Sequence, residues 1–188
     1  MGNNQSISCL VDRPQAQLST YLTPKQIKLV QDSWDEIKDD LPTLGVTIFL
    51  KFFETEPDMK SLFPKIVRMN EANQLEWDMD REMLQKHAVT VMEGLGAARP
   101  YINSLEDSDF LNSVLISIGQ THVKRSVKPQ MLKRLWPSLN HGLGVVLAEK
   151  YTKEVSEAWR KVYIYISVQM KRGMENPDRD FNEDMSVS

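Results

Sequence analysis

The chain has 188 residues, of which 41% are hydrophobic and 26% are charged, and its formal net charge is −3. This composition is typical of one globular domain, and the slightly negative charge excludes a general attraction to nucleic acid or anionic lipid. The single cysteine excludes an intramolecular disulfide, and without a transmembrane run or secretory pattern we expect an intracellular protein.

The first 22 residues are polar and lack a sustained helical period, so we expect a flexible N-terminal extension. Gly2 and Ser6 fit the pattern for N-myristoylation, and Cys9 offers a site for a palmitoyl group. One acyl chain holds a protein at a membrane only marginally, so lipids on both Gly2 and Cys9 predict attachment to the cytoplasmic leaflet of the plasma membrane. An unmodified tail on a cytosolic protein is the alternative.

Helical periodicity accounts for most of residues 23–174, which we expect to form one domain followed by an acidic tail over 175–188 that frays. No segment shows a convincing period of two, so the predicted fold class is all-α. The expected elements, in chain order, are a helix from Thr23 that ends before Pro42, a helix over 44–56, a turn over 57–64, a connector over 69–78, and helices over 81–97, 108–122, 129–146 and 152–170.

Two histidines, His87 and His122, lie on the apolar faces of separate predicted helices. Leu84 and Val91 flank the first imidazole on its face, and Ile118 lies one turn before the second. A lone histidine on such a face is usually a core residue with one hydrogen bond. Two imidazoles that face one interior can instead hold the iron of a flat cofactor from both sides, so the pair indicates haem.

The order and spacing of several motifs resemble the globin family over nearly all of residues 23–174. These motifs are Trp34 in the first helix, Gly45 and Phe49 in the second, Pro57 and Phe63 in the segment FFETEPDMKSLFP, QKHAVTV around His87, and GQTHVKRSV around His122. The resemblance implies a globin fold of about eight helices in a three-over-three arrangement, with flexible extensions at both ends. It also implies haem b as the cofactor.

The resemblance assigns the main roles in the pocket. His122 corresponds to the proximal iron ligand, His87 to the distal residue, and Phe63 to the ring that stacks on haem. The other pocket residues that the resemblance implies are Phe49, Val91, Ile118 and Val127. The distal imidazole either coordinates the iron itself or donates a hydrogen bond to a bound gas.

Supporting contacts follow from the chemistry of each group. The second ring nitrogen of His122 needs a partner, for which the Ile118 carbonyl and the Thr121 hydroxyl are candidates. The candidates to pair with haem propionates are Lys86, Lys124, Arg125 and Lys128. Two features depart from the family pattern: His122 follows His87 by 35 residues, which implies an extended loop over 100–107, and Thr90 stands where many globins carry a basic residue.

An acylated N-terminus ahead of a pocket with two histidines is similar to globin X, a membrane-attached relative of neuroglobin. This narrower resemblance implies two histidines on iron at rest and O2, NO, CO or nitrite as small ligands. It also implies an unidentified reductase as electron donor and a redox, NO-related or signalling role, without a nucleic acid partner. Two alternatives stay open: a haem enzyme that reduces nitrite, dioxygenates NO or removes peroxide, and a haem-free helical regulatory domain.

Overall fold

The computed structural model describes residues 22–69, 75–103 and 108–178. The α-helices in these ranges are α1 (Pro24–Ile37), α2 (Leu41–Thr55), α3 (Arg81–Gly96), α4 (Asp109–Val123), α5 (Trp136–Leu147) and α6 (Lys153–Glu175). Short 3-10 helices join them: η1 (Lys38–Asp40), η2 (Pro57–Leu62), η3 (Arg99–Tyr101), η5 (Pro129–Leu135) and η6 (Ala148–Lys150). The predicted all-α class is confirmed. Within the described ranges, no helix has the length and hydropathy to cross a bilayer.

One segment differs from the prediction. The expected connector over 69–78 contains most of an antiparallel hairpin of β1 (Val67–Met69) and β2 (Leu75–Met79). The Asp80 N–H donates to the Ile66 carbonyl at 2.9 Å at the base of this hairpin. A ladder of three residue pairs with a register shift is too short and irregular to leave a period of two in the sequence.

The helix starts follow from capping side chains. Thr23 forms a capping box with Gln26, and the side chains of Asp80, Ser108 and Thr152 each accept a hydrogen bond from a backbone N–H in the first turn that follows. These bonds satisfy donors that a helix start leaves unpaired. The expected boundaries at 23, 81, 108 and 152 are therefore confirmed to within one residue.

The predicted helix over 129–146 is divided in two. A 3-10 helix, η5, occupies its first seven residues, and α5 begins only at Trp136. Pro137 has no N–H to donate to the carbonyl of Lys133, so an α-helix cannot pass through this point with its hydrogen bonds complete. The apolar spacing is similar on both sides of the break, which is why it suggests one helix.

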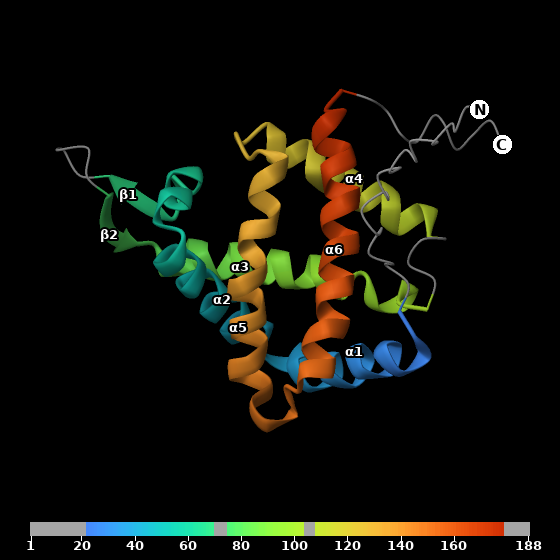
Figure 1. Ribbon diagram of the computed structural model, residues 1–188. Coiled ribbons are helices and arrows are strands. Elements are labelled where there is room, and N and C mark those ends of the chain that lie inside the picture. The colour runs from blue at the N-terminus through green and yellow to red at the C-terminus, as the bar shows by residue number, and fades with distance from the viewer. Residues whose placement is uncertain (1–21, 70–74, 104–107, 179–188) are drawn as a thin grey trace, which may run out of the picture.

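The helices cross rather than align as a parallel bundle (Figure 1). In this view α5 and α6 run antiparallel at the front, α3 runs across behind them, and α1 packs against α6 near the bottom. The largest apolar cluster joins α1 to α6 through the rings of Trp34 and Trp159, whose centroids are 6.2 Å apart. The indole N–H of Trp159 donates to the buried hydroxyl of Ser33 at 2.9 Å, so this core contact leaves no unpaired donor.

A second apolar cluster lies between α2, η2 and α3. It contains Phe49, Phe52 and Phe53 from α2 together with Met59 from η2 and Leu84 from α3. The two clusters border a space between α3 and α4, and this space holds the candidate site.

Candidate functional site

A cavity of about 390 Å³ lies between the two predicted histidine helices, and α2, η2, η5, α5 and α6 contribute the other helical parts of its wall. All seven pocket residues predicted from the sequence line it: Phe49, Phe63, His87, Val91, Ile118, His122 and Val127. Most of the other wall residues are apolar. The sequence pattern and the fold therefore converge on one space, of the size and character of a site for an organic cofactor.

His122 lies in the last turn of α4, and its ring is fixed by one hydrogen bond. Its Nδ1 lies 2.8 Å from the carbonyl oxygen of Ile118, one turn earlier. The other candidate partner, Thr121, instead donates its hydroxyl to the carbonyl of Ser117 at 3.1 Å. Because a carbonyl only accepts, Nδ1 carries the proton and Nε2 keeps a lone pair for a metal ion.

Glycines set the position of α4. A Cβ atom added at Gly119 would lie 2.0 Å from the carbonyl oxygen of Met170 in α6, and one added at Gly173 would lie 2.0 Å from that of Ile116. The two backbones are therefore in direct contact, one turn before His122. The sequence analysis did not identify this pair, although an isolated glycine inside a helical pattern is a recognised signal of close packing.

The chain leaves α4 through a tight turn. Ser126 has a φ of 64°, in the left-handed region, and the Val127 N–H donates to the His122 carbonyl at 3.2 Å. This turn folds Val127 back against the cavity. A small polar residue tolerates the left-handed conformation better than a β-branched one, which suits serine to this position.

His87 lies on α3 between two aromatic rings. The centroid of its imidazole is 5.0 Å from the ring of Phe49 and 5.4 Å from the ring of Phe63, and both pairs meet edge to face. Burial lowers the pKa of His87, and electrostatic interactions with His122 and Arg125 lower it further. The imidazole is therefore neutral near pH 7, which is the form that coordinates a metal ion.

Close contact between α2 and α3 brings Phe49 to His87. A Cβ atom at Gly45 would lie 2.8 Å from the Cβ of Ala88, which is fully buried. Gly45 thus permits the close approach of α2 and α3. Phe49, about one turn further along α2, then reaches the imidazole of the residue that precedes Ala88.

The four predicted propionate partners are not equivalent. Arg125 lines the cavity, whereas Lys86 forms an ion pair with Glu82 at 2.6 Å and lies outside the wall. Lys124 and Lys128 are exposed and also lie outside it. Only Arg125 of these four is therefore placed to pair directly with an anionic group at the edge of the cavity.

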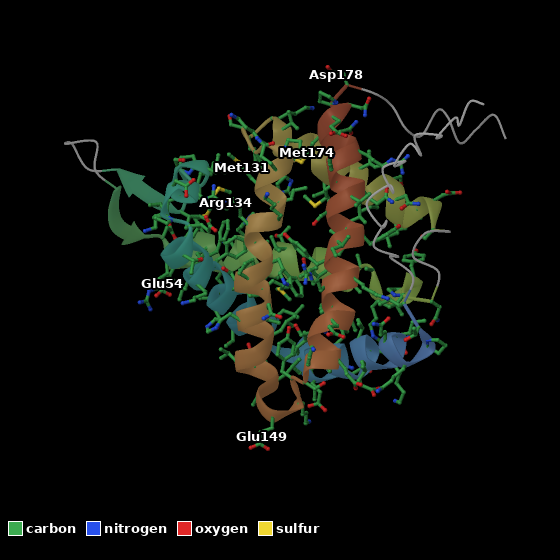
Figure 2. The ribbon with its side chains drawn as sticks, in the orientation of Figure 1. Glu54, Met131, Arg134, Glu149, Met174 and Asp178 are labelled. Atoms are coloured by element: carbon green, nitrogen blue, oxygen red, sulfur yellow. The ribbon has the colours of Figure 1, made fainter. Side chains whose placement is uncertain are left out.

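Several wall residues were missed by the sequence analysis. Tyr163 from α6 is buried, donates its hydroxyl to the Leu132 carbonyl at 2.5 Å, and packs its ring 5.6 Å from that of Trp136. Burial raises the pKa of Tyr163. Met131 also lines the cavity and lies beside Arg134 at the side that faces η2 (Figure 2). Neither residue belongs to a motif, so only the fold identifies them.

The two predicted acylation sites, Gly2 and Cys9, lie outside the described residues. Their modification stays a prediction.

Known proteins resemble this chain along most of its length. A model of the globin family matches residues 46–170. Cytoglobin-1 of Oryzias latipes is 29% identical over 154 residues, which cover 81% of this chain and 84% of that protein. Neuroglobin of Tetraodon nigroviridis is 26% identical over 159 residues, which cover 85% of this chain and 96% of that protein.

A solved structure has the same fold. The structure of a hexacoordinated haem protein from an anhydrobiotic tardigrade superposes with a TM-score of 0.69 at 23% identity. The match covers 82% of this chain and 96% of the tardigrade protein. This similarity confirms the predicted fold.

Proposed function

Since the chain belongs to the globin family, we propose that it binds haem between His122 and His87 and uses the iron to bind small gaseous ligands. The observation that carries the proposal is the presence of two imidazoles in the wall of one apolar cavity, one of them with its Nδ1 already bonded to a carbonyl. A histidine that merely fills a core would not need a second one across a cavity.

The residues that line the cavity fit haem. Haem is a flat apolar ring with two carboxylates at one edge, and the wall of the cavity is apolar with Arg125 on it. Covalent attachment through C-x-x-C-H needs two cysteines, whereas the chain has only Cys9. These features support haem b, which His122, His87 and the apolar wall would hold without a covalent bond to the chain.

Haem would supply an iron centre that accepts nitrogen ligands and diatomic gases. His122 presents Nε2, while the bond from Nδ1 to Ile118 fixes the ring plane and increases the basicity of the ligating nitrogen. His87 presents a neutral imidazole from the opposite wall, held by Phe49 and Phe63. We propose that both imidazoles bind at rest. The tardigrade protein, which has the same fold, is a hexacoordinated haem protein.

A resting distal ligand shapes the role of the protein. An external ligand would bind only when His87 has moved away, so the apparent affinity for that ligand would fall in proportion to the fraction of molecules in which His87 occupies the site. This competition suits a redox, NO-related or signalling role better than bulk oxygen storage. Such a role needs an electron donor, which we propose to be a cellular reductase.

We further propose that acyl groups on Gly2 and Cys9 hold the domain at the cytoplasmic leaflet of the plasma membrane. The support is the sequence pattern alone. Two anchors separated by a few residues give stable attachment, whereas one gives a reversible equilibrium.

Absorption spectra and turnover test these proposals. A purified protein without a Soret band would be a haem-free helical domain, and the proposal would fail. A protein with haem that turns over nitrite, NO or peroxide in the presence of a reductase at a rate far above free haem would instead be an enzyme. Replacement of His122 by Ala should leave little haem bound, because α4 then offers no other imidazole to the cavity.

A further inference from the structure

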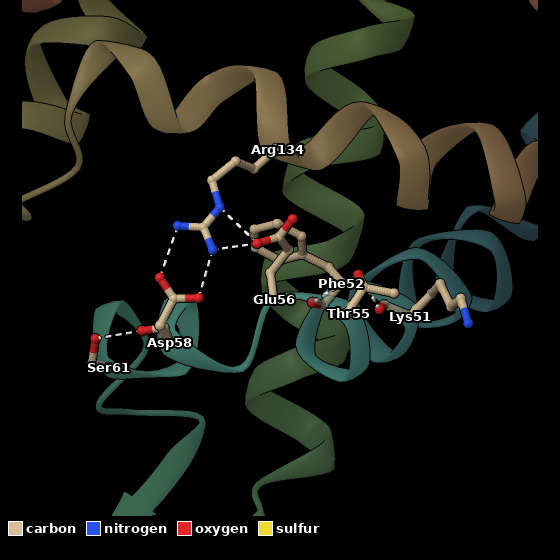
Figure 3. Close-up of polar contacts among 7 residues, drawn as sticks. All are labelled: Lys51, Phe52, Thr55, Glu56, Asp58, Ser61 and Arg134. Atoms are coloured by element: carbon tan, nitrogen blue, oxygen red, sulfur yellow. Dashed lines mark hydrogen bonds and ion pairs between the residues drawn. The ribbon is translucent and has the colours of Figure 1, made fainter.

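An arginine joins two wall segments that are far apart in sequence (Figure 3). Arg134, on η5, donates from Nε to Glu56 Oε2 at 2.7 Å and from one terminal nitrogen to Asp58 Oδ2 at 2.8 Å, while its other terminal nitrogen donates to both carboxylates. We call these three residues the Arg134 clamp. One guanidinium thus uses all three of its nitrogens on two carboxylates.

The clamp is built to hold its shape. The side chains of Arg134 and Glu56 are 26% and 27% exposed, while Asp58 is 64% exposed. Bidentate pairing of a planar guanidinium fixes orientation as well as distance, and partial burial limits screening by salt. The arginine also holds the pKa of Asp58 below its usual range. The ionised form of the Asp58 carboxyl is therefore favoured in the clamp.

Both segments that the clamp joins belong to the cavity wall. Glu56 and Asp58 flank the start of η2, which leads to Phe63, and Arg134 lies near the end of η5. Met59 from η2 and Met131 and Leu135 from η5 pack in one apolar cluster beside the clamp, and all three line the cavity. The charged contact on the outside and the apolar contact on the inside therefore hold the same two segments together.

The clamp is connected to the distal histidine through Phe63. That ring lies 5.4 Å from the imidazole of His87. Phe63 directly follows η2, and its backbone N–H donates to the Lys60 carbonyl of η2 at 3.0 Å. If η2 moves away from η5, Phe63 moves with it and the imidazole loses one of the two rings that confine it.

From this connection we propose that Arg134 is a positioning residue: the clamp holds η2 against η5 and so restrains the movement of His87 in the cavity. The role of His87 on iron rests on the proposed function, whereas the restraint on η2 does not. Arg134 does not line the cavity, so it acts through Phe63 and not by contact with a ligand.

Amide hydrogen exchange of the haem-free full chain tests the restraint on η2. The backbone amides of Phe63 and Ile66, just after η2, donate to the carbonyls of Lys60 and Phe63. In Arg134→Gln these two amides should exchange about tenfold faster than in the wild type. Arg134→Lys keeps the charge but not the forked geometry, and it should give an intermediate rate. Arg99→Gln is the matched control, because Arg99 donates from Nη2 to both oxygens of Asp35 at 3.0 Å but does not line the cavity.

CO binding to the ferrous haem-loaded chain tests the effect on His87, since association waits for the imidazole to leave the iron. The rate in Arg134→Gln should exceed that of Arg99→Gln several-fold, with a larger high-spin fraction in the spectrum. Equal exchange in the two variants would overturn the clamp, and faster exchange with unchanged CO kinetics would overturn its effect on His87. A wild type that takes up no haem would refute the proposed function, while the exchange experiment would still decide whether the clamp holds η2.

Discussion

Replacement of Gly119 by Ala should separate α4 from α6 and weaken the site. The added Cβ would lie 2.0 Å from the carbonyl oxygen of Met170, and contacts under 3.0 Å are essentially never seen, so the helices must move apart by about 1 Å. The obstacle is backbone, which has no rotamer to change, so the cost should fall at about 3 kcal/mol, the upper end for an overpacked core. Alanine regains about 1 kcal/mol in helix propensity, which leaves a net loss of about 2 kcal/mol.

Urea unfolding of the haem-free protein measures this loss. Gly94→Ala is the matched control, because nothing lies within 4 Å of the Cβ position at Gly94, so this variant should gain stability from helix propensity. With an unchanged m-value, the midpoint should fall for Gly119→Ala and rise for Gly94→Ala. The reasoning would be refuted if both variants were stabilised alike. The same displacement moves His122, so Gly119→Ala should also release haem faster than the wild type does.

Three further predictions concern the pocket and the anchor. His87→Leu should give a high-spin ferrous spectrum and faster CO binding than the wild type in stopped-flow experiments, and unchanged kinetics would show that His87 does not bind the iron at rest. Because burial raises the pKa of Tyr163, the folded protein keeps a phenolic proton that the unfolded chain loses above about pH 10, so the free energy of unfolding should fall as pH rises through that value. Tyr163→Phe should reduce this slope in urea titrations at several pH values, and an identical slope would contradict the assignment. Gly2→Ala should move the protein from membrane to cytosol on cell fractionation and Cys9→Ser should weaken its attachment, both with wild-type spectra; a wild type as soluble as Gly2→Ala would make the acylation pattern incidental.

The sequence could predict those parts of the fold that depend on local chemistry. Capping hydroxyls and carboxylates locate the helix starts, and the apolar periodicity places His87 and His122 on inward faces. Pro137 prevents one continuous α-helix over 129–146, and the apolar spacing does not show this break. Hydrophobic periodicity indicates which face of a helix is buried, but not which backbone hydrogen bonds can form.

Features that arise from tertiary contact could not be predicted in the same way. The contact between Gly119 and Met170 depends on how α4 crosses α6, and a glycine alone does not reveal its partner. The Arg134 clamp joins Arg134 to Glu56, 78 positions earlier, and to Asp58, 76 positions earlier. Each of these charges taken singly resembles a solvated surface group. The hairpin of β1 and β2 is too short to show an alternating pattern.

The central proposal is that His122 and His87 both bind the haem iron. Its sharpest test is the visible absorption spectrum of the purified full-length protein, in the ferric and ferrous states and without added ligand, beside that of His122→Ala. We expect a low-spin six-coordinate spectrum in both oxidation states for the wild type and loss of most bound haem in the variant. A wild type without haem, or a His122→Ala variant with the wild-type spectrum, would contradict it.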